Sequence, residues 1–349
     1  MRLAVPTILL LALSVVPSLA ASAVEVEHSA PPEPKTLPPL ATDPMHVMPV
    51  LPKPQPAVAA DLGALEELAP GVHIARGKWV VLDGVLAIDK GPTDGLEVLA
   101  CLKDGKNHET LVRLDTTQGQ LVKAACIAAL GLVDGQPTDE GSGLPARGQP
   151  VSVTIRWQDG GKTVAIPASQ LVRDRVVDRP FPELAWPYVG SRFEKVLTND
   201  VTGRPQQREV FMLDATRSIV VNFDEPDALI ASAFPVAIND QRFEVYSAIC
   251  PPAGTPLQLV IGPAILPLTL SLATDGTLHD AQGAVLDDAA LGKALSVVYG
   301  TDPVPALHTV GVEVAATAAR QGDVQARARI LAAAAAAKLW VSPLFVPKP

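Results

Sequence analysis

Basic residues and cysteines are both scarce in this sequence. Lys and Arg total 28 against 37 Asp and Glu, a net charge of -9, and no basic stripe interleaved with aromatic residues offsets it locally. Such a chain repels the phosphate backbone, so we do not expect nucleic acid as a partner. Cys101, Cys126 and Cys250 are its only cysteines. They are too few for a disulfide scaffold, and the sequence leaves their pairing open.

The sequence also lacks the short motifs of common catalytic and nucleotide-binding sites. No GxSxG, GxGxxG or CxxC occurs, and "HET" does not open a zinc motif because the fifth residue from His108 is Val112. The stretch "DGGKT" at 159–163 resembles the end of a phosphate loop, but Arg156 occupies the position of the required first glycine. Strand-like residues flank it on both sides, so we predict a hairpin there.

Residues 1–23 form a hydrophobic leader. Arg2 precedes an apolar run from Leu3 to Val16, and the small residues Ala21–Ala23 follow. This order is typical of a cleaved secretory signal peptide, and an uncleaved anchor helix remains the alternative. We therefore expect a periplasmic or otherwise extracytoplasmic protein, with no membrane span after signal cleavage.

A proline-rich segment follows the leader. Ten prolines occur in the 26 residues from Pro31 to Pro56, and no hydrophobic period accompanies them. Such a segment buries too little surface to fold, so we predict that residues 24–60 are a disordered, polyproline-like tether. At about 3.1 Å per residue, the 26 residues from Pro31 to Pro56 reach about 80 Å when fully extended.

The rest of the chain predicts an α+β fold in two domains. Residues 61–263 are rich in short apolar or alternating runs bounded by turn residues, which favour strands, and "GQLVKAACIAAL" has helical spacing. Residues 264–349 predict a small α/β domain with the order strand, helix, strand, helix, strand. Asp287 and Asp323 are the expected N-caps of its two helices.

The first domain resembles the YdjY-type family of exported bacterial proteins over residues 71–263. The stretches that carry the resemblance are "LEVLAC", "GKNHET", "ALGLVDGQP", "VGSRF", "NFDEPDALI" and "PPAGTPLQLVIGP". The resemblance implies an exported domain and brings no established activity.

Residues 265–349 are similar to the periplasmic domain of ExbD/TolR-type biopolymer-transport proteins. The carrying stretches are "LSLATDGTLHDAQGAVLDDAALGKAL" and "VGVEVAATAARQGDVQARARILAAAAAAKLWVSPLFV". Members of that family place a membrane helix with an ion-coupling carboxylate just before this domain, and the 200 residues before it here contain no such helix. The resemblance therefore implies binding of a partner or the cell wall, or self-association.

Cys101 and His108 are the candidate catalytic or metal-binding residues. If Asp104-Gly105 formed a two-residue hairpin turn, Cys101 would lie directly opposite His108, and thiol and imidazole could touch. An imidazolium beside a thiol favours the reactive thiolate. As a metal site the pair supplies two ligands where zinc takes three or four. The remaining interpretation is a hairpin with a buried cysteine and a histidine at the strand edge.

A second group of polar residues lies in "NFDEPDALI". Asp224, Glu225 and Asp227 are close together in the sequence and could hold calcium weakly, although a proline-containing turn explains them more simply. Taken together, the sequence predicts an exported, non-catalytic envelope protein without cofactors. Its expected partner is an envelope protein or cell-wall component, or a second copy bound through the C-terminal domain. The alternative is a thiol-dependent redox or metal-binding protein that uses Cys101 and His108.

Overall fold

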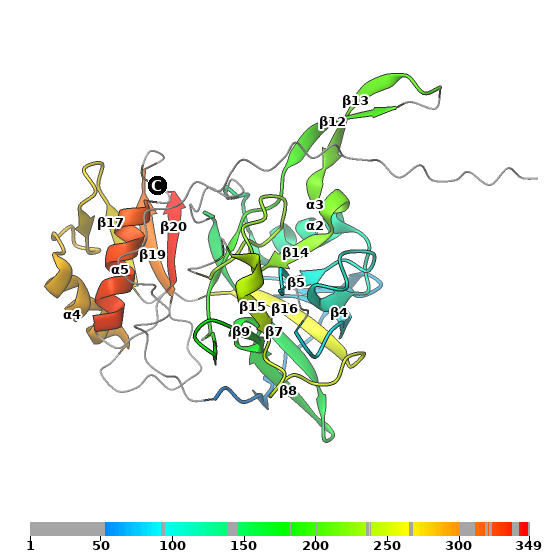
Figure 1. Cartoon of the computed structure of the whole chain (residues 1–349), viewed down its shortest axis with the longest axis horizontal. Coiled ribbons are helices and arrows are strands. Elements are labelled where there is room, and N and C mark those ends of the chain that lie inside the picture. Colours follow the sequence, from blue (N-terminus) through cyan, green and yellow to red (C-terminus); the bar gives the residue numbers. More distant parts are fainter. Residues whose placement is uncertain are drawn as a thin grey trace, which may run out of the picture.

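The computed structural model describes most of the chain after the proline-rich segment. The described residues are 53–91, 95–137, 146–181, 183–199, 202–234, 237, 239–264, 268–299, 311–317, 320, 323–336 and 342–347. The predicted signal peptide and most of the predicted tether lie outside them. The predicted α+β class is confirmed, because strands dominate and helices pack beside them (Figure 1).

An eleven-stranded sheet forms the body of the protein. Its main path is β1-β8-β7-β16-β4-β6-β5-β14, with β11 paired to β7 and the pair β2-β3 joined to β4. The strands are β1 (Ala57–Val58), β2 (Glu66–Ala69), β3 (Val72–Ala75), β4 (Trp79–Leu86), β5 (Val98–Cys101), β6 (Thr110–Leu114), β7 (Gln149–Asp159), β8 (Lys162–Pro167), β11 (Trp186–Tyr188), β14 (Ser218–Val221) and β16 (Pro256–Pro263). The first strand lies inside the predicted tether 24–60. That boundary was wrong, because Ala57 and Val58 pair with β8 as an edge strand.

The predicted hairpin at 159–163 is confirmed. Asp159 pairs with Lys162 at the end of the β7-β8 ladder. Gly160 and Gly161 have φ angles of 54° and 79°, and two consecutive positive φ angles are the geometry that the favoured two-residue hairpin turn demands. The phosphate-loop interpretation is thus excluded by local geometry.

Apolar side chains from the sheet and one helix fill the core. The helix α2 (Gly119–Leu130) agrees with the predicted helical stretch, and Gly131 ends it in the left-handed conformation with its amide bonded to the Ile127 carbonyl at 2.9 Å. Val122 and Cys126 on its inner face are fully buried. The same core contains an aromatic group, in which the Phe181 and Phe234 rings meet edge to face with centroids 4.1 Å apart.

Two smaller sheets extend the body. The first contains β9 (Val172–Asp174), β10 (Arg179–Pro180) and β15 (Phe243–Val245), flanked by the short 3-10 helices η1 (Ala168–Leu171) and η2 (Asp240–Arg242). The second is a two-stranded ribbon of β12 (Phe193–Asn199) and β13 (Pro205–Phe211), followed by the short helix α3 (Met212–Thr216). We call this ribbon the arm. Figure 1 shows that it projects away from the body.

The C-terminal unit is a separate four-stranded sheet with two helices. Its strands, in the order β18-β17-β19-β20, pair with no strand of the preceding region among the described residues. The elements are β17 (Leu268–Leu272), β18 (Leu278–His279), α4 (Asp288–Tyr299), β19 (Gly311–Ala316), α5 (Val324–Ala336) and β20 (Ser342–Pro347). The strands β17, β19 and β20 run parallel, so each helix crosses over between two of them.

Both predicted N-caps of this unit are confirmed. The Ala290 amide donates to the Asp287 carboxylate at 2.7 Å, and the Ala326 amide donates to the Asp323 carboxylate at 2.9 Å. Each carboxylate satisfies an amide that the first helical turn leaves unbonded. Among the described residues, no helix combines the length and the apolar character needed to cross a membrane.

Candidate functional site

The segment that contains Cys101 and His108 is not the predicted hairpin. β5 and β6 run parallel, and Cys101 is aligned with Arg113. The predicted register, which placed Cys101 opposite His108 across an Asp104-Gly105 turn, is therefore wrong. Residues 102–109 instead form a loop that carries the chain back to the start of β6.

Contacts with a distant segment explain why this loop replaces the hairpin. The Leu102 amide donates to the Arg217 carbonyl at 2.9 Å, so the backbone after Cys101 bonds to the residue before β14. Leu102 is fully buried. Gly105 then folds back over the thiol, since a Cβ on Gly105 would lie 2.9 Å from the Cβ of Cys101. These tertiary contacts outweigh the local preference of Asp-Gly for a tight hairpin.

The two candidate residues have opposite environments. Cys101 is 1% exposed, and its thiol lies 3.6 Å from Asn107 Oδ1 as a donor. Burial raises the pKa of the Cys101 thiol, and the Thr110 hydroxyl and the Arg113 guanidinium only partly oppose this. The His108 side chain is 82% exposed, and its nearest acidic atom is Glu109 Oε1 at 4.0 Å. Among the residues that the structure describes, no imidazole therefore lies beside Cys101 as an activating base.

We predict that Cys101 does not react with a thiol reagent such as iodoacetamide in the folded protein at pH 8. The thiol is buried, and its raised pKa keeps it protonated, whereas the thiolate is the reactive form. Rates of alkylation at each cysteine, read by mass spectrometry before and after unfolding, check this. Rapid labelling of Cys101 that disappears in His108→Ala would contradict it and restore the thiol candidate.

Metal ligands are also dispersed. In the part of the chain that the structure describes, no three His, Cys, Asp or Glu side chains gather as a metal site. All three cysteines are free thiols, with Cys101 and Cys126 buried and Cys250 partly exposed. The arrangement therefore points away from thiol and metal chemistry and toward polar contacts between elements.

Such contacts gather on the turn that follows β14, which contains Asp224, Glu225 and Asp227. We call residues 224–227 the acidic turn. Asn222 fixes its start, because its amide donates to the Glu97 carbonyl at 2.8 Å and its side-chain amide donates to the Leu96 carbonyl at 3.0 Å. The acidic turn is thereby attached to the chain just before β5.

Glu225 faces the loop 102–109. Lys106 lies among carboxylates there, with its Nζ 3.2 Å from Glu97 Oε2 and 3.3 Å from Glu109 Oε1, and the Glu225 charge raises its pKa. Burial raises the pKa of Glu225 to about 7, against the lowering effects of Lys106 and Ser218. Two sequence stretches with no obvious connection, 97–109 and 222–227, thus form one charged cluster.

Asp227 faces the base of the arm. Its carboxylate accepts a hydrogen bond from Arg192 Nε at 2.7 Å, and the Ser191 hydroxyl donates to its carbonyl at 2.6 Å. The same hydroxyl accepts a hydrogen bond from the Leu213 amide at 3.1 Å. Because Ser191 precedes β12 and Leu213 follows β13, this bond joins the two ends of the arm. Arg192 also contacts Glu194 at 2.7 Å. These bonds hold the two ends of the ribbon to the acidic turn.

Asp224 faces the C-terminal unit. It is 8% exposed, and Arg327 of α5 is the cation that acts on it. Arg327 Nη2 also donates to the Phe234 carbonyl at 3.5 Å, a bond between the two parts of the chain. Burial raises the pKa of Asp224 to about 6, and Arg327 opposes this only in part. The three carboxylates of the acidic turn therefore lie near three different cations from three different segments of the chain. They do not converge on one point, so they do not form the weak calcium site considered from the sequence.

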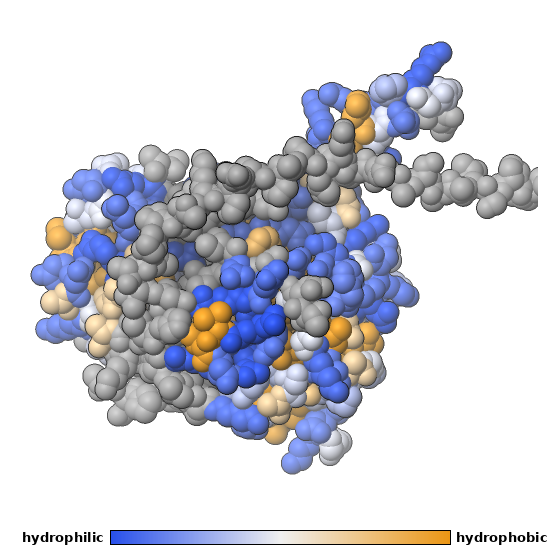
Figure 2. Space-filling model, viewed as in Figure 1, coloured by the Kyte–Doolittle hydropathy of each residue, from blue (hydrophilic) through white to orange (hydrophobic). Residues whose placement is uncertain are grey.

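The arm carries exposed apolar side chains on one face. Phe193 is 55% exposed and Leu197 is 69% exposed, and both lie on the face that also carries Lys195 opposite Glu209. At the base, the Phe193 and Phe211 rings lie 5.0 Å apart. Figure 2 shows apolar atoms exposed on the projecting arm. Neither strand pairs with a further strand among the described residues.

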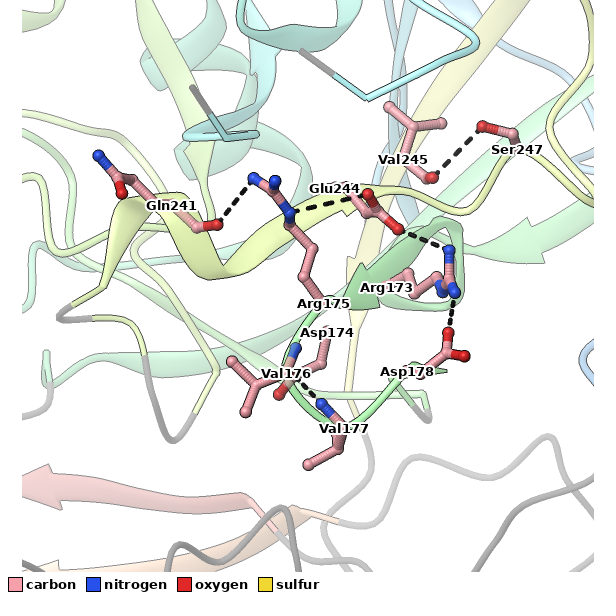
Figure 3. A network of polar contacts seen from close by, with 10 residues as sticks. All are labelled: Arg173, Asp174, Arg175, Val176, Val177, Asp178, Gln241, Glu244, Val245 and Ser247. Atoms are coloured by element: carbon pink, nitrogen blue, oxygen red, sulfur yellow. Dashed lines mark hydrogen bonds and ion pairs between the residues drawn. The ribbon is translucent and has the colours of Figure 1, made fainter. Parts of the chain in front are cut away.

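A second polar network surrounds β9 and β15 (Figure 3). Glu244 Oε1 lies 2.7 Å from Arg173 Nη1, and Arg173 also contacts Asp178. Beneath them, buried Asp174 accepts Arg242 Nε at 2.8 Å. In Figure 2 the surface over this region is strongly hydrophilic around a small apolar patch. The close packing of these pairs indicates a structural role.

Comparison with known proteins found no match to this chain among family models, curated proteins or solved structures. The resemblances to the YdjY-type and ExbD/TolR-type families therefore remain expectations from short sequence stretches.

Sequence reasoning singled out the acidic residues 224, 225 and 227 and the segment from Cys101 to His108, but it predicted a hairpin for that segment and missed the connection between the two. It also missed the arm. The sequence signal for it was weak, because Phe193 and Leu197 share the exposed face of β12 with Lys195, and Val196 lies on the opposite face. An alternating strand that exposes its apolar face has the same sequence pattern as one that buries it.

Proposed function

We propose that this protein is an exported cell-envelope binding or assembly protein that acts without catalysis. It would combine a YdjY-like strand-rich domain (61–263) with a small ExbD/TolR-like α/β domain (264–349). Its partners would be an envelope protein, a cell-wall component or a second copy of the chain. The observation that carries the proposal is the projecting arm with its exposed apolar face.

An isolated two-stranded ribbon is at best marginally stable in water. The arm is nevertheless held in place at its base, by the Arg192-Asp227 bond and by the Met212 amide, which donates to the Arg192 carbonyl at 2.9 Å. A firmly held base with an exposed apolar face is an arrangement suited to insertion into a partner. Large apolar side chains grouped on a projection are also a typical mark of a protein interaction site.

Unpaired strand edges support the same function. The outer edges of β12 and β13 present backbone donors and acceptors that no described strand bonds. Such edges can take up an extended strand from a partner, with main-chain hydrogen bonds giving affinity and alternate side chains giving specificity. The predicted tether, which ends before β1, would supply the reach that an envelope protein uses.

No contact among the described residues supports the thiol-dependent alternative. Cys101 is buried, and the His108 side chain lies in solvent. We therefore propose no second function.

We predict that Leu197→Glu weakens association with the isolated envelope fraction by about tenfold or more. Burial of a leucine side chain contributes about 1.5 to 3 kcal/mol, and a carboxylate at this position opposes burial further. Co-sedimentation of the purified full chain with the envelope fraction measures the effect, and analytical ultracentrifugation of the chain alone measures self-association.

The matched control is Val176→Glu. Val176 is 57% exposed, against 69% for Leu197, but it lies in the turn between β9 and β10, which belong to a different sheet from the arm. This variant should associate like the wild type. The proposal fails if the wild-type chain is a monomer that does not bind the envelope fraction, or if both variants bind equally well.

A further inference from the structure

The helix α2 carries a second exposed apolar surface. Gln120, Ala124, Ile127 and Ala128 are exposed along one side of the helix, and Ile127 is 44% exposed. We call these four residues the outer side of α2. A helix at the surface of a protein normally turns polar side chains to water, and here Gln120 alone does so. The apolar outer side therefore indicates a contact that the single chain leaves unmade.

The outer side of α2 begins beside the base of the arm (Figure 1). Lys123, next to Ala124 on the helix, places its Nζ 5.4 Å from the centroid of the Phe211 ring. The helix α3, which follows the arm, holds the first turn of α2, because Asp214 accepts a hydrogen bond from the Gly119 amide at 3.0 Å. The exposed apolar faces of α2 and of the arm therefore start from one junction.

The two faces are complementary in size. The arm carries the bulky side chains Phe193 and Leu197, which are 55% and 69% exposed. The outer side of α2 is lined by the methyl groups of Ala124 and Ala128, and Gly131 ends the helix without a side chain. Large side chains pack closely against a face of small ones. Because the arm projects away from the body, its apolar face can reach α2 of another molecule (Figure 1).

The charges around the two faces are complementary as well. On the exposed face of the arm, Lys195 lies opposite Glu209 across the ribbon. Beside α2, Lys123 Nζ lies 2.6 Å from Asp134 Oδ2. Each face thus presents one ammonium and one carboxylate. When two copies meet, Lys195 can pair with Asp134 of the other copy and Glu209 can pair with its Lys123, so no charge loses a partner.

We propose that the partner of the arm is a second copy of this chain, which receives the arm on the outer side of α2. The inference rests on the proposed function, because it names the partner of the same exposed arm. Since the arm and α2 meet at one junction, a two-fold axis beside it lets each copy give its own arm and receive that of the other. This reciprocal contact closes on itself, so the assembly is a dimer and not an open chain of copies.

Analytical ultracentrifugation of the purified full chain over a range of concentrations tests the inference. The wild type should dimerise, and Leu197→Glu and Ala128→Glu should each weaken dimerisation by about a hundredfold. The dimer contains the contact twice, and a loss of about tenfold in each contact multiplies. Ala289→Glu is the matched control, because Ala289 is also an exposed alanine of a helix but lies on α4. It should dimerise like the wild type.

A double variant shows that the two faces meet each other. Leu197→Glu combined with Ala128→Lys should dimerise more tightly than either single variant, because the new carboxylate of one copy meets the new ammonium of the other. Such a recovery also shows that the single variants are folded, which circular dichroism checks independently.

Three results would overturn the inference: a wild-type chain that stays monomeric at every concentration, an Ala128→Glu variant that dimerises like the wild type, or a double variant that dimerises no better than its single variants. The proposed function has a separate readout, which is co-sedimentation with the envelope fraction. If the chain is monomeric but Leu197→Glu reduces that co-sedimentation, the arm binds another envelope component and only the inference of a second copy fails.

Discussion

Asp174→Ala should lower the free energy of unfolding by about 3 to 5 kcal/mol. Asp174 is fully buried, and its carboxylate accepts Arg242 Nε at 2.8 Å and the Val176 amide at 2.8 Å (Figure 3 shows the surrounding network). Without the carboxylate, a guanidinium whose side chain is 9% exposed loses the ion pair that it forms with Asp174. A buried charge deprived of its counter-charge is among the most destabilising changes that one substitution makes.

Unfolding by urea at 25 °C and pH 7, followed by circular dichroism, measures this loss. Asp178→Asn is the matched control. It also removes a carboxylate that contacts an arginine, Arg173, but the side chain is 72% exposed, and asparagine tolerates the positive φ of 55° that this residue adopts. Exposed ion pairs contribute little, so the control should change stability by no more than about 0.5 kcal/mol. If the two variants lost the same free energy of unfolding, burial would not be the reason why the Asp174-Arg242 pair stabilises the protein.

Glu225→Gln should stabilise the protein by up to about 3 kcal/mol at pH 8 and leave it nearly unchanged at pH 4. The folded state raises the pKa of Glu225 from 4.5 to about 7, with burial as the main cause. The folded protein then binds more protons than the unfolded chain between these values. Ionisation of Glu225 therefore destabilises the fold increasingly from about pH 4.5 to pH 7, and by a constant amount above that.

Urea unfolding at several pH values checks the window. The wild-type protein should lose stability as the pH rises through it, and the raised pKa of Asp224, from 3.8 to about 6, acts in the same direction. Glu66→Gln is the control, because Glu66 forms an exposed contact with Arg76 at 3.4 Å and should leave the pH dependence as it is. A Glu225→Gln variant with the same pH dependence as the wild type would contradict the prediction.

Local features of the fold were predictable because they depend on neighbouring residues. Asp287 and Asp323 begin helices in the structure as they did in the sequence pattern, since an N-cap bonds to amides only three residues away. The hairpin at 159–163 was predictable because two consecutive glycines suit one type of tight turn.

The pairing of strands was less predictable. The Asp104-Gly105 dipeptide has the composition of a hairpin turn, yet β5 and β6 run parallel. A hydrogen bond from the Leu102 amide to the Arg217 carbonyl holds the backbone after β5 in place of a hairpin turn. Arg217 lies more than a hundred residues further along the chain. A turn preference is a small energy, and tertiary contacts of this kind override it.

The sequence by itself determined the class of fold, the helices α2, α4 and α5, and the presence of charged residues at 97–109 and 222–227. Only the tertiary structure decided what those charges do. In the folded chain Asp224 lies near Arg327 of α5, and Glu225 lies near Lys106. Asp227 bonds to Arg192 at the base of the arm. Burial also changes their pKa values, and burial is a property of the folded chain that a residue and its sequence neighbours do not contain.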